Sequence, residues 1–169
     1  MCKQPQGGVL SDGTISMGAG LADLVRVAAK QTYIVGDIAI EHATMGEPLA
    51  CVVHSVRLSG FSAGDRVAVL GAGYMGRLHL ALCRSQGAAS VGMIDISEAR
   101  TAEALDAGAS RVSSFDGAQE WNGEYDVVFV TAGVPGAVEL ALDLCDDGGA
   151  VVLYGAFPKD IMASVGADR

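Results

Sequence analysis

At residues 69–76 the chain reads Val69-Leu70-Gly71-Ala72-Gly73-Tyr74-Met75-Gly76. The glycines have the spacing G-x-G-x-x-G, which by itself is a weak signal. Its surroundings strengthen it, because a β-rich run at residues 66–70 precedes it and residues with the spacing of one helix face follow it. We therefore predict a strand, a tight turn and a helix, an arrangement that holds the pyrophosphate of a dinucleotide.

The three glycines have different expected roles. Gly71 permits the tight turn, Gly73 lets the backbone approach a phosphate, and Gly76 lets the helix pack close to the strand. The helix presents free N–H groups and the positive end of its dipole to the phosphates. The residues between the glycines belong to the same expected cofactor site, namely Ala72, Tyr74 and Met75.

A second expected strand, at residues 90–94, ends immediately before Asp95. A carboxylate at this place accepts hydrogen bonds from the ribose hydroxyls of the adenosine half and repels a 2′-phosphate. Asp95 therefore favours NAD over NADP, and the apolar Ile96 after it fits that choice. Arg100 is near enough in sequence to reach the ribose or a phosphate.

Two other interpretations of the glycine stretch stay open. One is a turn that binds no ligand. The other is an S-adenosylmethionine-dependent methyltransferase, which uses a similar glycine turn with a ribose-binding acid. The glycine spacing fits a dinucleotide better than S-adenosylmethionine.

Strands and helices alternate from about residue 62 onward. Further strands are expected near residues 111–112, at 126–131 and at 150–154, and helices at 97–107 and 138–145. Ser97 is the expected N-cap of the first helix, and Gly148-Gly149 should end the second. Five strands separated by helices predict an α/β fold, a doubly wound parallel sheet of the Rossmann type.

The first 60 residues have a different pattern. Short strands are expected at residues 21–27 and 32–35. Pro48 suits the first turn of a helix. The apolar stripe of that helix is expected at Leu49, Val52, Val53 and Val56.

Composition limits the classes of partner. The 169 residues are half apolar and carry a net charge of −9, which argues against a nucleic acid or an anionic membrane as partner. No apolar stretch approaches a membrane span, and the first eight residues lack the apolar run of a signal peptide, so we expect a cytoplasmic protein. The cysteines form no C-x-x-C pair, and Cys51, Cys83 and Cys145 are expected as buried free thiols.

Four segments resemble the cofactor domain of zinc-dependent, medium-chain alcohol and polyol dehydrogenases. These are residues 46–57 (GEPLACVVHSVR), 64–76 (GDRVAVLGAGYMG), 104–109 (ALDAGA) and 126–133 (DVVFVTAG). The resemblance extends from about Gly20 to Pro158, and the Glu-Pro-Leu sequence is similar to the sorbitol and threonine dehydrogenase branch.

The resemblance implies NAD(P)-linked oxidation of a small secondary alcohol or polyol at a zinc ion, which would act as a Lewis acid. It implies that Thr131, Ala132 and Gly133 line the nicotinamide pocket, with Gly155 near it. It also places Glu47 at or next to the zinc. An equally good interpretation of Glu47 is an acid favoured by the dipole at a helix N-terminus.

The departures from the family are specific. The family's Gly-His-Glu zinc sequence is absent, since His42, His54 and His79 all have other neighbours, and its cluster of four structural-zinc cysteines is represented at most by Cys2. A catalytic zinc needs three protein ligands, and Glu47 is the one candidate. No catalytic residue can be named.

We also expect five strands where such a sheet usually has six. This predicts the middle of a dehydrogenase, truncated or a fragment, with a remnant of the catalytic domain at residues 1–45 and the cofactor domain at 46–169. An open sheet edge and uncovered apolar residues near Leu21–Val27 would favour a homo-oligomer. A non-catalytic NAD-binding module is the alternative to an enzyme.

Overall fold

The computed structural model describes residues 8–9, 15–16 and 29–157. The chain divides into two compact units, Met1–Ala39 and Ile40–Arg169. In the first unit, β1 (Gly8–Val9) pairs antiparallel with β2 (Ile15–Ser16), and η1 (Ala29–Gln31) is a short 3-10 helix. The strand predicted at 21–27 lies outside the described residues. The strand predicted at 32–35 is wrong, because this stretch is irregular and none of the described strands pairs with it.

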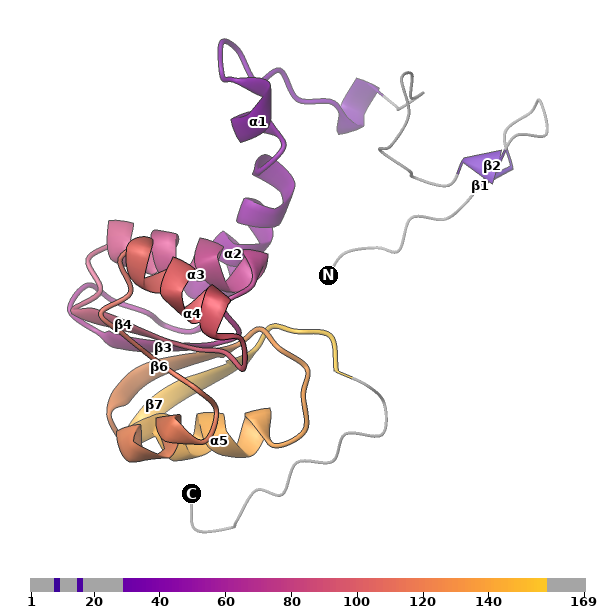
Figure 1. Cartoon of the computed structure of the whole chain (residues 1–169). Coiled ribbons are helices and arrows are strands. Elements are labelled where there is room, and N and C mark those ends of the chain that lie inside the picture. Colours follow the sequence, from indigo (N-terminus) through magenta and orange to yellow (C-terminus); the bar gives the residue numbers. More distant parts are fainter. Residues whose placement is uncertain (1–7, 10–14, 17–28, 158–169) are drawn as a thin grey trace. The chain divides into compact units, whose positions relative to one another are not determined.

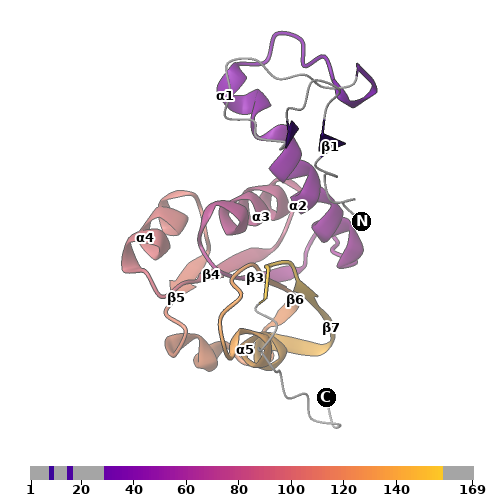
Figure 2. The same ribbon diagram turned by 90° about the vertical axis from the view of Figure 1, so that its right-hand side faces the viewer.

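The second unit confirms the predicted α/β class. Its elements, most of them labelled in Figure 1 and β5 in Figure 2, are α1 (Ile40–Ala43), α2 (Gly46–Leu58), β3 (Arg66–Leu70), α3 (Tyr74–Ser85), β4 (Ser90–Ile94), α4 (Glu98–Asp106), β5 (Arg111–Ser113), η2 (Gly117–Trp121), β6 (Tyr125–Val130), α5 (Ala137–Leu144) and β7 (Cys145–Leu153). The five strands β3 to β7 form one parallel sheet in the order β5-β4-β3-β6-β7. This is the Rossmann order, in which the chain crosses from one half of the sheet to the other beside its first strand.

The sheet is covered on both faces. Helices α2, α3 and α4 pack on one face, and α5 with η2 packs on the other (Figures 1 and 2). Along β3 the side chains alternate between these layers, since Val67 and Val69 belong to one apolar core and Ala68 and Leu70 to the other. Strands buried on both faces are continuous apolar runs, which is why the sequence identified them.

Helix α2 forms where Pro48 predicted it, but its buried face is shifted. Val52 and Val56 are buried as expected, and Ser55 joins them. Leu49 is exposed, so the first turn of α2 does not continue the apolar stripe. Of the three expected buried thiols, Cys83 is buried, whereas Cys51 and Cys145 are half-buried.

The predicted end of α5 is wrong. Cys145 already has extended backbone angles (φ −73°, ψ 133°) and pairs with Tyr125 of β6. The pairing then jumps to Val127 opposite Ala150, so the residues between bulge out of β7, with Gly148 at φ +78°. The two glycines therefore belong to a bulge within a strand rather than to a helix stop.

None of the helices in the described ranges has both the length and the apolar character needed to cross a membrane.

Candidate dinucleotide-binding site

The strand register brings the expected site residues to one edge of the sheet. Leu70 at the end of β3 lies opposite Ile94 at the end of β4 and opposite Val130 of β6. Val130 in turn lies opposite Leu153 of β7. The segments that follow these four strand ends therefore start at the same level, and ligands of such sheets bind outside the carboxyl ends of the strands.

At Gly71 and Gly76 the turn has the geometry that the sequence predicted. Gly71 has φ +106°, and a Cβ there would lie 2.5 Å from Oγ1 of Thr131. A Cβ at Gly76 would lie 1.8 Å from the carbonyl oxygen of Gly71, so α3 can pack on the turn only with glycine at this place. Gly73 has an ordinary φ of −71°, and a Cβ there would have nothing within 4 Å. The fold thus requires glycine at two positions and leaves Gly73 facing open space.

The N-terminus of α3 opens onto that space. Its N-cap residue, Gly73, offers no side chain to the first-turn N–H groups, which lack partners within any helix. A hollow of about 320 Å³ lies beside them. It is lined by Gly71, Gly73, Tyr74, Met75, Gly76, Asp95, Arg100, Thr131 and Ala132. These backbone groups and the helix dipole suit an anion such as a diphosphate.

Asp95 is held inside the turn, with its side chain only 6% exposed. Its Oδ2 accepts the N–H of Ala72 at 2.8 Å, and its Oδ1 accepts the N–H of Ser97 at 2.9 Å. Each carboxylate oxygen keeps a further lone pair for a ribose hydroxyl. The sequence predicted the ribose-binding role but not this bracing of the turn. Arg100 places Nη1 3.8 Å from Oδ2, on the open side.

The expected N-cap role of Ser97 holds for its backbone but not for its side chain. Ser97 stands at the N-cap of α4 with extended angles, and its hydroxyl makes no capping bond. Its N–H instead donates to Asp95.

A smaller apolar pocket of about 120 Å³ continues from Asp95. Among its lining residues are Ile96, Phe115, Val134 and Ala137. Sequence reasoning did not identify Phe115 or Val134 as site residues, because they lie in irregular segments whose spacing carries no signal. The pocket has the apolar character that suits a flat base next to the ribose position.

The segments that follow β6 and β7 pack closely against each other beside the glycine turn. Thr131 donates its hydroxyl to the carbonyl oxygen of Leu70 at 2.9 Å. A Cβ at Gly133 would lie 2.1 Å from the carbonyl oxygen of Ala156, and one at Gly155 would lie 2.9 Å from that of Thr131. These glycines are therefore needed for close backbone approach. Gly133 and Gly155 do not line the hollow itself.

Glu47 lies exposed in the first turn of α2, one helical turn before Cys51. The Cys51 thiol is 3.8 Å from its Oε1. Burial raises the pKa of the nearby Tyr154 phenol, and Cys51 and Glu47 raise it further. Nowhere in the described ranges do three or more His, Cys, Asp or Glu side chains gather in a way that holds a metal ion. The donor set around Glu47 therefore does not fit a catalytic zinc, which needs three protein ligands.

A buried histidine supports the helix behind the turn. His79 Nδ1 donates to the carbonyl oxygen of Met75 at 2.8 Å, so Nε2 accepts from the hydroxyl of Ser55 at 3.1 Å. Its ring lies 4.7 Å from the rings of both Phe129 and Tyr154, centroid to centroid. Burial lowers the pKa of the imidazole below its usual 6.5. The sequence alone did not predict this network, because Ser55, Phe129 and Tyr154 are distant from His79 along the chain.

The chain is similar in sequence to dehydrogenases. The profile of the family described as zinc-binding dehydrogenase matches residues 75–167. The chain is 31% identical to D-altritol 5-dehydrogenase of Agrobacterium fabrum over 156 residues, which cover 89% of this chain and 46% of that protein. It is 37% identical to L-threonine 3-dehydrogenase of Bacillus licheniformis over 117 residues, which cover 64% and 34%.

Solved structures agree with this match. A zinc-binding dehydrogenase from Sinorhizobium meliloti with bound NADP superposes with a TM-score of 0.71 at 32% identity, covering 75% of this chain and 40% of that chain. One from Clostridium scindens superposes with a TM-score of 0.74 at 28% identity, covering 78% and 40%. The chain thus spans less than half the length of the relatives that it matches.

Proposed function

Because the chain belongs to the zinc-binding dehydrogenase family, in its cofactor-domain portion, we propose that it binds a nicotinamide dinucleotide in the hollow beside α3. The observation that carries this proposal is Gly73, a glycine that faces open space and that the fold itself does not require. A diphosphate placed there meets the free N–H groups of the first turn of α3.

We assign NAD rather than NADP. The support is the buried Asp95 carboxylate, whose charge repels a 2′-phosphate next to the ribose. The exposed Ile96 adds no positive charge beside it. Among the described residues that line the hollow, Arg100 is the one cation, and it is paired with Asp95. A related protein was solved with NADP, so the choice is open to direct test.

The reaction we propose is hydride transfer between the nicotinamide and a small secondary alcohol or polyol. Bound NAD supplies the hydride acceptor. The chain orients it through the turn at Gly71–Gly76 and through Thr131, Ala132, Gly133 and Gly155, which we assign to the nicotinamide side. We assign residues 46–169 to the cofactor domain and residues 1–45 to the catalytic domain. No zinc-dependent step is assigned to Glu47, because its neighbours do not complete a metal site.

The binding step is tested by calorimetric titration of the whole chain with NAD, NADP and S-adenosylmethionine. We expect NAD to bind most tightly and S-adenosylmethionine not to bind. S-adenosylmethionine binding in place of NAD would revive the methyltransferase alternative. NAD binding without turnover of any alcohol or polyol would correspond to a non-catalytic NAD-binding module.

Substitution of Gly73 provides the site-specific test. Gly73→Val places a side chain in the diphosphate position without a backbone clash, so we expect NAD binding to be lost and the melting temperature to stay near the wild-type value. Gly46→Ala is the matched control, since Gly46 also has open space and does not line the hollow. Retained NAD binding in Gly73→Val would show that the turn is not the site.

A further inference from the structure

Tyr74 occupies a position of the glycine motif where the motif itself specifies no side chain. It is the first residue of α3 and lines the hollow, and its side chain is large yet 47% exposed. Its hydroxyl donates to the sulfur of Met45, at 2.9 Å. A thioether sulfur is a weak acceptor compared with a carbonyl, hydroxyl or phosphate oxygen. The phenol is therefore a strong donor at the rim of the site with a weak partner.

The other side-chain donors that line the hollow belong to Thr131 and Arg100. The Thr131 hydroxyl donates to the carbonyl oxygen of Leu70, inside the fold. The Arg100 guanidinium lies at Asp95, where the adenosine ribose is expected. Tyr74 instead reaches toward Met45, the residue that precedes α2 and Glu47. Tyr74 thus contacts the segment before α2, whereas Arg100 contacts Asp95.

We propose that the Tyr74 hydroxyl exchanges Met45 for the bound dinucleotide and donates a hydrogen bond to an oxygen of its diphosphate or of its nicotinamide-side ribose. This inference rests on the proposed function, because it concerns the same hollow. The exchange is favourable because a phosphate oxygen is charged and a hydrogen bond to a charged group is the stronger one. Tyr74 would then be a cofactor-binding side chain specific to this chain's version of the motif.

The test is Tyr74→Phe, which keeps the ring and removes only the hydroxyl. Calorimetric titration with adenosine, ADP and ADP-ribose separates the parts of the ligand. We expect adenosine binding to be unchanged and ADP-ribose binding to weaken about tenfold, the size of one hydrogen bond to a charged group. A loss already present with ADP assigns the bond to the diphosphate, and a loss confined to ADP-ribose assigns it to the ribose.

Met45→Leu is the matched variant, since it removes the sulfur and conserves the volume. We expect it to bind ADP-ribose as tightly as the wild type or a few-fold more tightly, because the phenol no longer has to leave an acceptor. A loss in Met45→Leu equal to that in Tyr74→Phe would overturn the inference and make the Tyr74–Met45 contact a structural one.

The remaining outcomes are also decisive. Wild-type binding of ADP-ribose that Tyr74→Phe leaves unchanged would overturn this inference alone. An equal loss for adenosine and ADP-ribose would overturn it too, since the hydroxyl would then act on the fold. Failure of the wild type to bind ADP-ribose and NAD would refute the proposed function together with the inference.

Discussion

At the scale of single residues, three glycines of one motif are present for three different reasons. Gly71 has both a positive φ and a close neighbour, and Gly76 has only the close neighbour. Gly73 has neither, and it differs from other unconstrained glycines such as Gly46 in lining the hollow, where we propose that the diphosphate binds. The motif could be read from the sequence because its demands are local. The hydrogen bonds of Asp95 could not be predicted in this way, because one of the two N–H groups that it accepts lies 23 positions before it and the other two positions after it.

Asp95 should therefore have two separable effects when it is removed. We expect Asp95→Ala to weaken NAD binding more than NADP binding, since the repulsion of a 2′-phosphate disappears with the charge. We also expect the free energy of unfolding to fall by about 1–3 kcal/mol, because the N–H of Ala72 loses its acceptor. Calorimetry and urea unfolding measure the two effects. Glu98→Ala, which removes an exposed carboxylate nearby on α4, is the control. Equal weakening of NAD and NADP would refute the role of the charge.

His79 gives the molecule a pH-dependent stability. Its pKa is lowered in the folded chain, so the unfolded chain binds the proton more readily. The stabilisation by neutral His79 is therefore complete above about pH 6.5 and is lost progressively as the pH falls below that value. Protonation would also remove the Nε2 acceptor for Ser55. We expect urea unfolding between pH 7 and pH 5 to show a steeper loss of stability in the wild type than in His79→Leu. Parallel profiles would contradict this.

At the scale of elements, the sequence predicted all five strands of the large sheet. Buried parallel strands are apolar runs, and such runs can be identified without knowledge of their neighbours. The end of α5 could not be predicted this way. Cys145 leaves the helix to pair with Tyr125, a contact between residues 20 positions apart. The exposure of Leu49 has the same origin, since it depends on what packs against α2.

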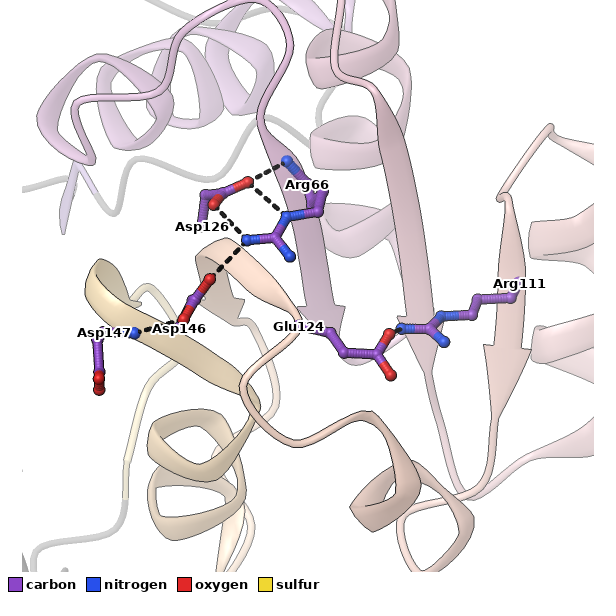
Figure 3. Close-up of polar contacts among 6 residues, drawn as sticks. All are labelled: Arg66, Arg111, Glu124, Asp126, Asp146 and Asp147. Atoms are coloured by element: carbon purple, nitrogen blue, oxygen red, sulfur yellow. Dashed lines mark hydrogen bonds and ion pairs between the residues drawn. The ribbon is translucent and has the colours of Figure 1, made fainter.

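Arg66 holds the irregular start of β7 (Figure 3). Its guanidinium contacts Asp126 of β6 at 2.7 Å and Asp146 of β7 at 2.8 Å, at the amino end of the sheet. We expect Arg66→Met to speed hydrogen exchange around residues 146–150, with little global destabilisation because exposed ion pairs contribute little to stability. NAD affinity should not change, since the candidate site lies at the carboxyl ends of the strands and Arg66 at their amino ends.

Arg111→Met is the control for this prediction, because Arg111 binds Glu124 at the same end of the sheet but lies on β5 (Figure 3). Unchanged hydrogen exchange at residues 146–150 in Arg66→Met would show that β7 does not depend on this contact.

Arg66 also holds the pKa of Asp126 at about 2, below its usual 3.8. The stabilisation from Asp126 is therefore complete above about pH 4 and is lost as the pH falls through 2.

At the scale of the whole molecule, the described residues form a candidate cofactor site but not a metal site. The glycine turn, Asp95 and the segments after β6 and β7 converge on one edge of the sheet within a single compact unit. The described ranges bring no comparable set of metal ligands together. The matched region is 46% of the altritol dehydrogenase. The candidate cofactor site could be predicted from the sequence because its residues follow the strands of one sheet.

The free side of β7 leads to a prediction about assembly. Among the described strands, β7 pairs with β6 alone, and Leu153 at its end is 55% exposed. An unpaired strand edge with apolar side chains favours pairing with another chain. We expect light scattering to show self-association that grows with concentration, and we expect Leu153→Lys to reduce it. Leu58→Lys should not, because Leu58 is an equally apolar exposed residue on a helix rather than at the sheet edge. A monomeric wild type at high concentration would refute association through β7.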